Sequence, residues 1–278
     1  MPRAKSQAGR RRRAPLTAKT ADKFDLYTRA VQAPDEDAAF MARYFTKLTG
    51  RQARLFREDF CGTAALACAF VKRHPENRAV GVDLDGPTLD WGRKHHVAAL
   101  TEDQQRRIQL IQANVLDVRR PKVDALCALN FSYFIFSTRD ELRAYFRNCR
   151  RSLVSDGVLF LDLWGGSETQ NEQVDRRRCG GFTYLWDQWK FDPLTYRSTC
   201  RIHFEFKDGS KMRNAFVYEW RLWTPPELTE LLDEAGFSSH HFLWEGTDRK
   251  TGAGNGVYRR TTRGTADRAW IAYLIARP

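Results

Sequence analysis

The chain has 278 residues, of which 42% are hydrophobic, and it carries a formal net charge of +12. This length and composition support one sizeable folded core, and the longest apolar run is far shorter than the ~20 residues of a membrane span. The N-terminus lacks the apolar segment of a secretory signal, and the six cysteines form no C-x-x-C pair. We therefore expect a cytoplasmic protein with reduced thiols, no membrane association and no disulfide or metal framework.

A basic segment opens the chain. Residues 1–22 are rich in lysine and arginine, including an unbroken run at residues 10–13, and such a composition is typical of a disordered arm. The simplest interpretation is a solubilising tail. The alternatives are an arm that binds nucleic acid or the ribosome, and an organelle transit peptide.

Two helices are expected in residues 23–48. Apolar residues recur there at helical spacing, and the pattern breaks at Pro34, which suits the first turn of a second helix. Tyr27 lies on the first of these helices.

Residues 54–85 predict a strand, a tight turn, a helix and a second strand. Cys61-Gly62-Thr63 supply the turn, and Asp83 ends the second strand. In a parallel sheet, ligands bind at the carboxyl ends of the strands. A tight turn lets backbone N–H groups approach a ligand, and a carboxylate about 20 residues later can accept hydrogen bonds from ribose hydroxyls. This segment therefore predicts a nucleoside site.

The turn is unsuited to a dinucleotide. It carries one glycine, Gly62, in place of G-x-G-x-x-G, and the acidic Glu58 and Asp59 precede it. Acidic side chains would repel a pyrophosphate. They suit a cofactor with positive charge, such as the amine and sulfonium of S-adenosylmethionine.

At this point the chain resembles the class I S-adenosylmethionine-dependent methyltransferases, whose first motif reads acid-x-G-C-G-T-G. Glu58, Cys61, Gly62 and Thr63 match. The first and last glycines of the motif are replaced by Phe60 and Ala64. The resemblance covers about residues 50–278. It implies an α/β, Rossmann-like fold: a seven-stranded, mostly parallel sheet with helices on both faces.

The resemblance also implies a cofactor site. Glu58 would hold the methionine amine, Asp83 the ribose hydroxyls, and Asn114 with Val115 the adenine, with Asp117 as a fallback. Asn114 could instead close an Asx turn, and Tyr27 is either a lid residue or a core aromatic. The cofactor-binding positions expected from the resemblance are Tyr27, Glu58, Phe60, Gly62, Asp83, Leu84, Asn114, Val115, Leu129 and Asn130.

Alternating helices and strands continue to residue 166. The pattern predicts a helix from Pro87 to about Leu100, strands at 108–111, 123–129 and 158–164, and a helix at 140–153. Asn130-Phe131-Ser132-Tyr133 follows the fourth strand, where the family presents its reactive loop. This tetrapeptide loosely resembles the N-P-P-Y motif of amino-methyltransferases that act on nucleic-acid bases, without its prolines. Asn130 and Tyr133 are the catalytic candidates; alternatively, Asn130 caps the turn.

An aromatic-rich insertion follows the fifth strand. We expect a polar connector at 167–181 and three antiparallel strands at 182–189, 196–206 and 211–222, with a hairpin turn at Asp208-Gly209. Its aromatic side chains could form a small core, cap a substrate cleft and surround a cationic amine, or mediate a homodimer. Trp164, Trp186 and Trp220 are the expected substrate-side residues.

The last third of the chain returns to the main sheet. The pattern predicts a helix starting after Thr224, a sixth strand at 240–244, a long loop at 246–265, and a final strand at 269–276 that the family places antiparallel beside strand six. The expected organisation is a basic arm (1–22), a methyltransferase domain (23–166 and 223–278) and a cap insertion (167–222).

The resemblance implies an S-adenosylmethionine-dependent methyltransferase that needs no metal. The first interpretation of its acceptor is a small-molecule amine or similar metabolite. The alternatives are methylation of RNA or a ribosomal component through the basic arm, and a catalytically silent binding module whose cleft Phe60 would close. The missing glycines disfavour a nicotinamide oxidoreductase.

Overall fold

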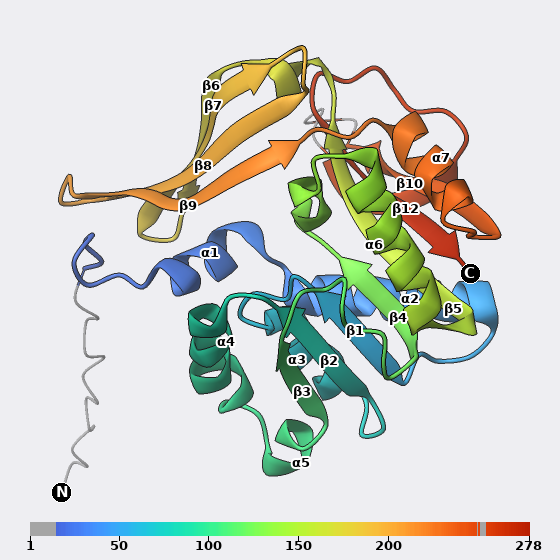
Figure 1. Ribbon diagram of the computed structural model, residues 1–278. Helices are drawn as coiled ribbons and strands as arrows, with labels where there is room; N and C mark the ends of the chain where they lie inside the picture. The colour runs from blue at the N-terminus through green and yellow to red at the C-terminus, as the bar shows by residue number, and fades with distance from the viewer. Residues whose placement is uncertain (1–14, 249, 251–253) are drawn as a thin grey trace, which may run out of the picture.

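The computed structural model describes residues 15–248, 250 and 254–278. Residues 1–14 of the expected basic arm lie outside this range. The described chain forms a mixed eight-stranded sheet flanked by helices and a separate antiparallel sheet of four strands (Figure 1). None of the described helices is long and apolar enough to cross a membrane.

The first half of the central sheet is parallel. Its strands lie side by side in the order β3 (Ile108–Gln112), β2 (Arg78–Asp83), β1 (Leu55–Asp59), β4 (Val123–Ala128) and β5 (Leu153–Gly165). The strand order reverses between β1 and β4, so the loops after these two strands open a crevice at their carboxyl ends.

The second half of the sheet is antiparallel. Strand β12 (Trp270–Arg277) lies between β5 and β10 (Ser239–Thr247), and β11 (Gly254–Thr261) forms the edge. The final strand therefore lies antiparallel beside the expected sixth strand, as predicted. The expectation of seven strands and a loop at 246–265 is wrong, because β11 adds an eighth. This strand is exposed and rich in glycine and arginine, so it lacks the apolar alternation that marks a half-buried strand.

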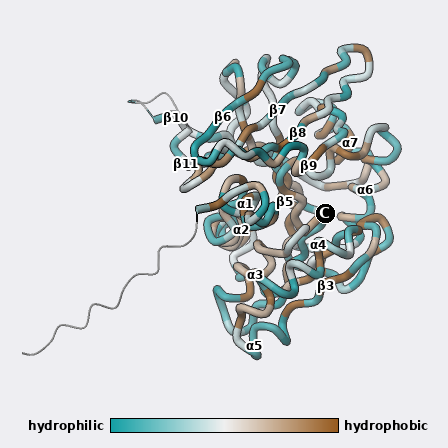
Figure 2. The backbone as a smooth tube through the Cα atoms, turned by 90° about the vertical axis from the view of Figure 1, so that its left-hand side faces the viewer, coloured by the Kyte–Doolittle hydropathy of each residue, from teal (hydrophilic) through white to brown (hydrophobic). Residues whose placement is uncertain are grey.

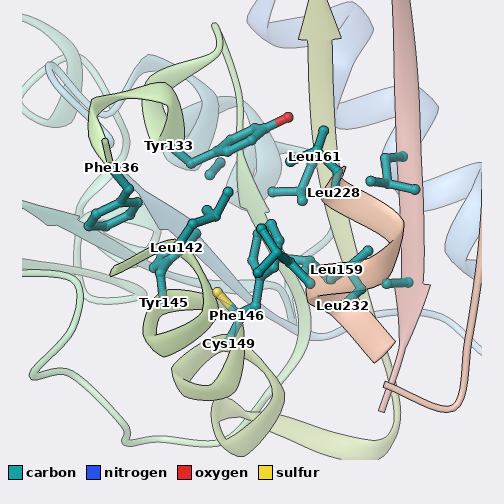
Figure 3. Close-up of a cluster of buried hydrophobic side chains, with 14 of the residues drawn as sticks. Tyr133, Phe136, Leu142, Tyr145, Phe146, Cys149, Leu159, Leu161, Leu228 and Leu232 are labelled. Atoms are coloured by element: carbon teal, nitrogen blue, oxygen red, sulfur yellow. The ribbon is translucent and has the colours of Figure 1, made fainter. Parts of the chain in front are cut away.

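Helices cover both faces of the central sheet. Helices α2 (Pro34–Thr49) and α3 (Ala65–Lys72) pack on one face. Helices α6 (Arg139–Ser152) and α7 (Pro225–Glu234) pack on the other, where their leucine and aromatic side chains meet β5 (Figure 3). Both α6 and α7 begin with a capping box, formed by Thr138 with Glu141 and by Thr224 with Glu227. The remaining helices are α1 (Lys23–Val31), α4 (Gly86–Gly92) with a π-helical turn (Arg93–Val97), and α5 (Glu102–Gln105).

The antiparallel sheet is inserted between β5 and α7. Its strands are β6 (Gln173–Cys179), β7 (Phe182–Asp192), β8 (Arg197–Phe206) and β9 (Lys211–Arg221), paired in that order. The predicted turn at Asp208-Gly209 joins β8 to β9. The expected connector at 167–181 is wrong in part, because β6 is an edge strand. Its side chains are mostly exposed and charged, so only its backbone pairing identifies it as a strand.

Helix α1 lies between the two sheets. Figure 2 shows α1 and α2 between the strands of the antiparallel sheet and the helices α3 to α5. Leu26 and Ala30 of α1 pack into the aromatic face of the antiparallel sheet, against Phe182, Ile202 and Phe204. The N-terminal helix therefore forms a wall between the inserted sheet and the carboxyl ends of the parallel strands.

Candidate functional site

The loop after β1 has an unusual backbone. Phe60 and Ala64 have φ values of 56° and 58°, in the left-handed region that glycine adopts readily and that costs an L-residue about 1–2 kcal/mol. These are the two positions where this chain replaces a glycine of the motif that it resembles. The chain therefore keeps glycine-like backbone conformations at these positions, although both residues carry side chains.

Asp83 holds this loop from the tip of β2. Its Oδ2 accepts a hydrogen bond from the Gly62 N–H at 2.7 Å, and its Oδ1 accepts one from the Asp85 N–H at 2.9 Å. A carboxylate has about four acceptor sites, so each oxygen can still accept another donor. Asp83 is thus fixed in place with capacity for the hydroxyls of a ligand.

Glu58 is a buried carboxyl at the end of β1. Its Oε2 accepts a hydrogen bond from the Ala67 N–H at 3.0 Å. Burial is the main cause that raises the pKa of Glu58 well above its usual range, and among the described residues it has no ion-pair partner. A cationic group brought next to it would therefore be bound favourably.

These groups line a cavity of about 310 Å³, called here the Asp83 cavity. Helix α1 contributes Phe24 and Tyr27 to its wall. Phe60 also lines it, and its ring packs on Phe136 and Tyr145, with centroids 6.0 and 5.8 Å away. Phe60 is therefore part of the wall of an open cavity and does not close it.

The expected adenine residues lie outside the lining of this cavity. Asn114 is exposed, and its Oδ1 accepts a hydrogen bond from the Leu116 N–H at 3.0 Å, which is the Asx turn considered as the alternative. Val115 is buried in the core and Leu84 is exposed. Their role in binding adenine stays a prediction.

A buried ion pair lies on β1, with one partner on either side of Glu58. Arg57 and Asp59 alternate on β1, both are about 1% exposed, and the Arg57 Nε lies 2.6 Å from the Asp59 Oδ1. Arg57 also donates to the carbonyls of Val115 and Val118, and the Tyr145 hydroxyl donates to Asp59. We call this group the Arg57 network. It joins β1, α6 and the loop after β3, and sequence reasoning missed it, although two opposite charges on a buried strand were a readable signal.

A second cavity of about 540 Å³, called here the Asp162 cavity, adjoins the first. It lies between the inserted sheet, helices α1 and α2, and the ends of β4, β5 and β12. The two cavities share a wall, because the same five residues line both: Tyr27, Leu129, Asn130, Tyr218 and Trp220. Asn130, an expected catalytic residue, therefore lies where the two cavities meet.

The wall of the Asp162 cavity is aromatic. The predicted substrate-side residues Trp164, Trp186 and Trp220 all line it, although they come from β5, β7 and β9. Ring centroids are 6.0 Å apart for Trp164 and Trp186 and 5.9 Å apart for Trp186 and Trp220, and Tyr218 stacks on Trp220 at 4.6 Å. The structure brings these three tryptophans together in one cavity wall, and their role in binding a substrate stays a prediction.

Asp162 fixes the loop that carries Asn130. Its two oxygens accept hydrogen bonds from the N–H groups of Asn130 at 2.7 Å and Phe131 at 3.0 Å. Both loop residues have a φ of 57°, so the carboxylate holds two successive left-handed residues. Burial raises the pKa of Asp162 to about 7.

Asp37, at the start of α2, is the second carboxyl of this cavity. Tyr273 donates a hydrogen bond to its Oδ1 at 3.3 Å, and burial raises the pKa of Asp37 to about 6. Sequence reasoning missed both carboxyls. The readable signal for Asp162 was an acid inside the apolar run of β5, whereas Asp37 looked like an ordinary acid in the first turn of a helix.

Tyr133 is not a site residue. It is fully buried, and its hydroxyl donates to the backbone carbonyl of Asp162 at 2.7 Å. The short 3₁₀ helix Ser132–Ile135 turns its ring into the core beside α6 (Figure 3). The prediction of a catalytic role for Tyr133 is therefore wrong.

Comparisons with known proteins agree with this geometry. Residues 60–157 match a family described as a methyltransferase domain, whereas a search of curated proteins found no match. Solved structures with the same fold include DesVI of Streptomyces venezuelae (19% identity, 92% of this chain and 97% of that chain, TM-score 0.67). They also include the amino pentose methyltransferase CalS10 of Micromonospora echinaspora with S-adenosylmethionine bound (18%, 92% and 96%, 0.65) and the sugar N-methyltransferase KedS8 of Streptoalloteichus sp ATCC 53650 (19%, 100% and 98%, 0.61).

Proposed function

We propose that this class I S-adenosylmethionine-dependent methyltransferase transfers the methyl group to the nitrogen of a small-molecule amine. The observation that carries the proposal is the Asp162 cavity, which shares a wall with the Asp83 cavity and has an aromatic wall with the carboxyls of Asp37 and Asp162. The two arginines of its lining are engaged elsewhere, Arg176 with Glu205 and Arg177 with the carbonyl of Ala30. Aromatic faces and carboxylates both attract a cationic nitrogen, and neither favours an anionic acceptor.

The residues around the Asp83 cavity fit the cofactor. Glu58 matches a positively charged amino group, Asp83 matches two ribose hydroxyls, and the backbone at Gly62 allows close approach. We assign the adenine to the side of Leu84, Asn114 and Val115. When bound, the cofactor supplies a methyl group on a positively charged sulfur.

The acceptor would react in the neighbouring cavity. An amine arrives protonated at neutral pH, so its nitrogen must lose a proton before its electron pair can form a bond. Asp162 has a pKa near 7 and is suited to accept this proton. The nitrogen then bonds to the methyl carbon as the carbon–sulfur bond breaks, and the electron pair of that bond stays on sulfur.

Positioning would supply most of the catalysis. The side chain of Asn130 lies where the two cavities meet and can orient the nitrogen through its carbonyl. Asp162 fixes the backbone of Asn130, and the aromatic wall excludes water. Holding two reactants in line is worth several kcal/mol of the barrier.

The names of structural neighbours support a nitrogen acceptor. They describe an amino pentose methyltransferase, a sugar N-methyltransferase and a glycopeptide N-methyltransferase. Each is less than 20% identical to this chain, so we transfer only the acceptor atom, nitrogen, and no particular substrate.

The test is methyl transfer from isotopically labelled S-adenosylmethionine. The acceptors are primary amines, alcohols of the same carbon skeleton, and total RNA, each with the full chain. The proposal predicts that label enters amines at a rate at least about tenfold above that for the matched alcohols. Labelling of RNA with no labelling of amines would contradict the proposal and favour a role for the basic arm.

A further inference from the structure

Two carboxyl groups in the Asp162 cavity, those of Asp37 and Asp162, form no ion pair with any residue that the structure describes. Among the described residues, no lysine, arginine or histidine forms an ion pair with Asp37 or Asp162. Arg176 and Arg177 also line the cavity, but Arg176 pairs with Glu205, and Arg177 donates to the carbonyl of Ala30. Within the described part of the chain, Asp37 and Asp162 are therefore two carboxyls of one cavity that a cationic ligand could pair with.

The partners of both carboxyls are neutral. Asp162 accepts two backbone N–H groups and Asp37 accepts the Tyr273 hydroxyl. Tyr273 and Asp162 are directly opposite on the antiparallel strands β12 and β5. Opposite residues project from the same face of a sheet with Cβ atoms about 5 Å apart. The two carboxyls are therefore separated by about one tyrosine side chain, with Tyr273 between them.

An unpartnered donor also points to a missing ligand. Trp220 is only 4% exposed, and its Nε1 has no hydrogen-bond partner. The same residue lines both cavities. A buried donor without an acceptor costs about 1–3 kcal/mol, so an acceptor atom on a bound molecule would remove this penalty.

We propose that the acceptor carries two basic nitrogens, one held by Asp162 next to the Asp83 cavity and the other by Asp37 beside Tyr273. The inference rests on the proposed amine methylation and names its substrate class, a dibasic amine. The nitrogen at Asp162 is the one that is methylated, because it is the one beside Asn130. The nitrogen at Asp37 anchors the molecule and stays protonated.

Charge balance favours two nitrogens over one. A molecule with two ammonium groups matches both buried carboxylates, whereas a monoamine leaves one of them uncompensated. An unpaired buried charge is strongly unfavourable. Burial is the main cause that raises the pKa of Asp37 and of Asp162, so each carboxylate would be stabilised by a cationic partner. We expect a diamine of the right length to bind at least about tenfold more tightly than the monoamine of equal length.

The test is calorimetric titration of the full chain saturated with S-adenosylhomocysteine. The ligands are α,ω-diaminoalkanes of increasing length, each compared with the n-alkylamine of the same carbon number. The inference predicts that one diamine length exceeds its monoamine by at least about tenfold. Equal affinities at every length would overturn it.

Three variants locate the second nitrogen. Asp37→Asn keeps the shape of the side chain and should reduce the affinity for the diamine to that for the monoamine, without weakening the monoamine. Tyr273→Phe should reduce only the diamine affinity, by a few-fold. Asp35→Asn is the matched control, because Asp35 lies in the same first turn of α2 but is exposed and outside the cavity lining, and it should change neither affinity more than about twofold.

The outcomes separate this inference from the function on which it rests. If monoamines and diamines are bound and methylated equally well, the two-nitrogen inference fails and amine methylation stands. If no amine is bound or methylated while RNA is labelled, both fail. Asp37→Asn could also weaken monoamine and diamine binding equally while the melting temperature stays unchanged. That result would overturn the anchoring role of Asp37.

Discussion

The Arg57 network and the Asp162 cavity bury carboxylates in opposite ways. In the first, Asp59 has its cation, Arg57, on the same strand. The other N–H groups of Arg57 donate to the carbonyls of Val115 and Val118 and to the Ser152 hydroxyl. In the second, Asp37 and Asp162 have only neutral donors. Where the chain supplies its own counterion, buried charge fixes the shape of the fold. Where it supplies none, buried charge is available to a ligand.

The largest effect on stability is expected from breaking the Arg57 network. Arg57→Leu leaves Asp59 buried without its cation, and such a loss typically lowers the free energy of unfolding by about 3–5 kcal/mol. Urea denaturation of both proteins measures it. The control is Arg106→Leu, which removes an exposed pair with Glu102 and should change the free energy of unfolding by less than about 0.5 kcal/mol. A loss below about 1 kcal/mol for Arg57→Leu would contradict the structural role of the network.

The Asp162 cavity should give two opposite trends with pH, one in the stability of the free protein and one in the affinity for an amine. Because the pKa values of Asp37 and Asp162 are raised to about 6 and about 7, the empty folded state holds more protons than the unfolded chain between about pH 4 and pH 7. These two groups therefore lower the stability of the free protein as pH rises through that window. The amine stays protonated there, so its affinity rises over the same window as the carboxyls ionise.

Calorimetry and thermal melting between pH 5 and pH 8 measure both trends. We expect diamine affinity to increase about a thousandfold from pH 5 to pH 8, since ionising Asp37 contributes about one pKa unit and ionising Asp162 about two over this range, and each pKa unit is a factor of ten in affinity. The increase should shrink in Asp162→Asn. An affinity independent of pH would show that neither carboxyl binds the amine.

A smaller effect is expected at Glu58. Glu58→Gln keeps an oxygen that can accept the Ala67 N–H but removes the charge that we propose binds the cofactor amine. Affinity for S-adenosylhomocysteine should fall about tenfold, in line with the loss of one charge-assisted hydrogen bond. Glu76→Gln, at the surface, serves as the control. Unchanged affinity in Glu58→Gln would place the amine elsewhere.

The smallest effect concerns the backbone of the loop after β1. Ala64→Gly should raise the free energy of unfolding by about 0.5–1 kcal/mol, because Ala64 has a φ of 58° and glycine adopts this conformation without strain. Ala65→Gly, one residue later and inside α3, should instead lower it by about 1 kcal/mol. Chemical denaturation of the pair distinguishes the two signs, and a loss of stability in Ala64→Gly would contradict the strain.

Local patterns predicted the elements that have local signals. Buried parallel strands appeared as apolar runs. Helix α7 begins directly after Thr224 as predicted, α6 begins one residue before its predicted start at 140, and the hairpin turn occurs at Asp208-Gly209. The edge strands β6 and β11 were missed because polar, exposed strands owe their conformation to backbone pairing with a neighbour and not to side-chain alternation.

The residues around the Asp83 cavity were easier to predict together than those around the Asp162 cavity, where the aromatic residues were expected but Asp37, Asp162 and Tyr273 were not. Gly62, Glu58 and Asp83 lie within one contiguous segment, so the motif showed them together. Asp37 and Tyr273 are joined by a hydrogen bond across 236 positions of the chain, and no local pattern links them. The division into arm, methyltransferase domain and cap, and the possible role of the cap in a homodimer, stay predictions.

The most direct test titrates S-adenosylhomocysteine into the wild-type chain, Asp83→Ala and Asp37→Asn. The account predicts micromolar binding to the wild type and at least about a hundredfold weaker binding to Asp83→Ala, since two hydrogen bonds to a charged group are lost. It predicts unchanged binding to Asp37→Asn, which affects only the acceptor cavity. Absence of binding to a folded wild type, or equal losses in both variants, would contradict the separation of the molecule into a cofactor cavity and an acceptor cavity.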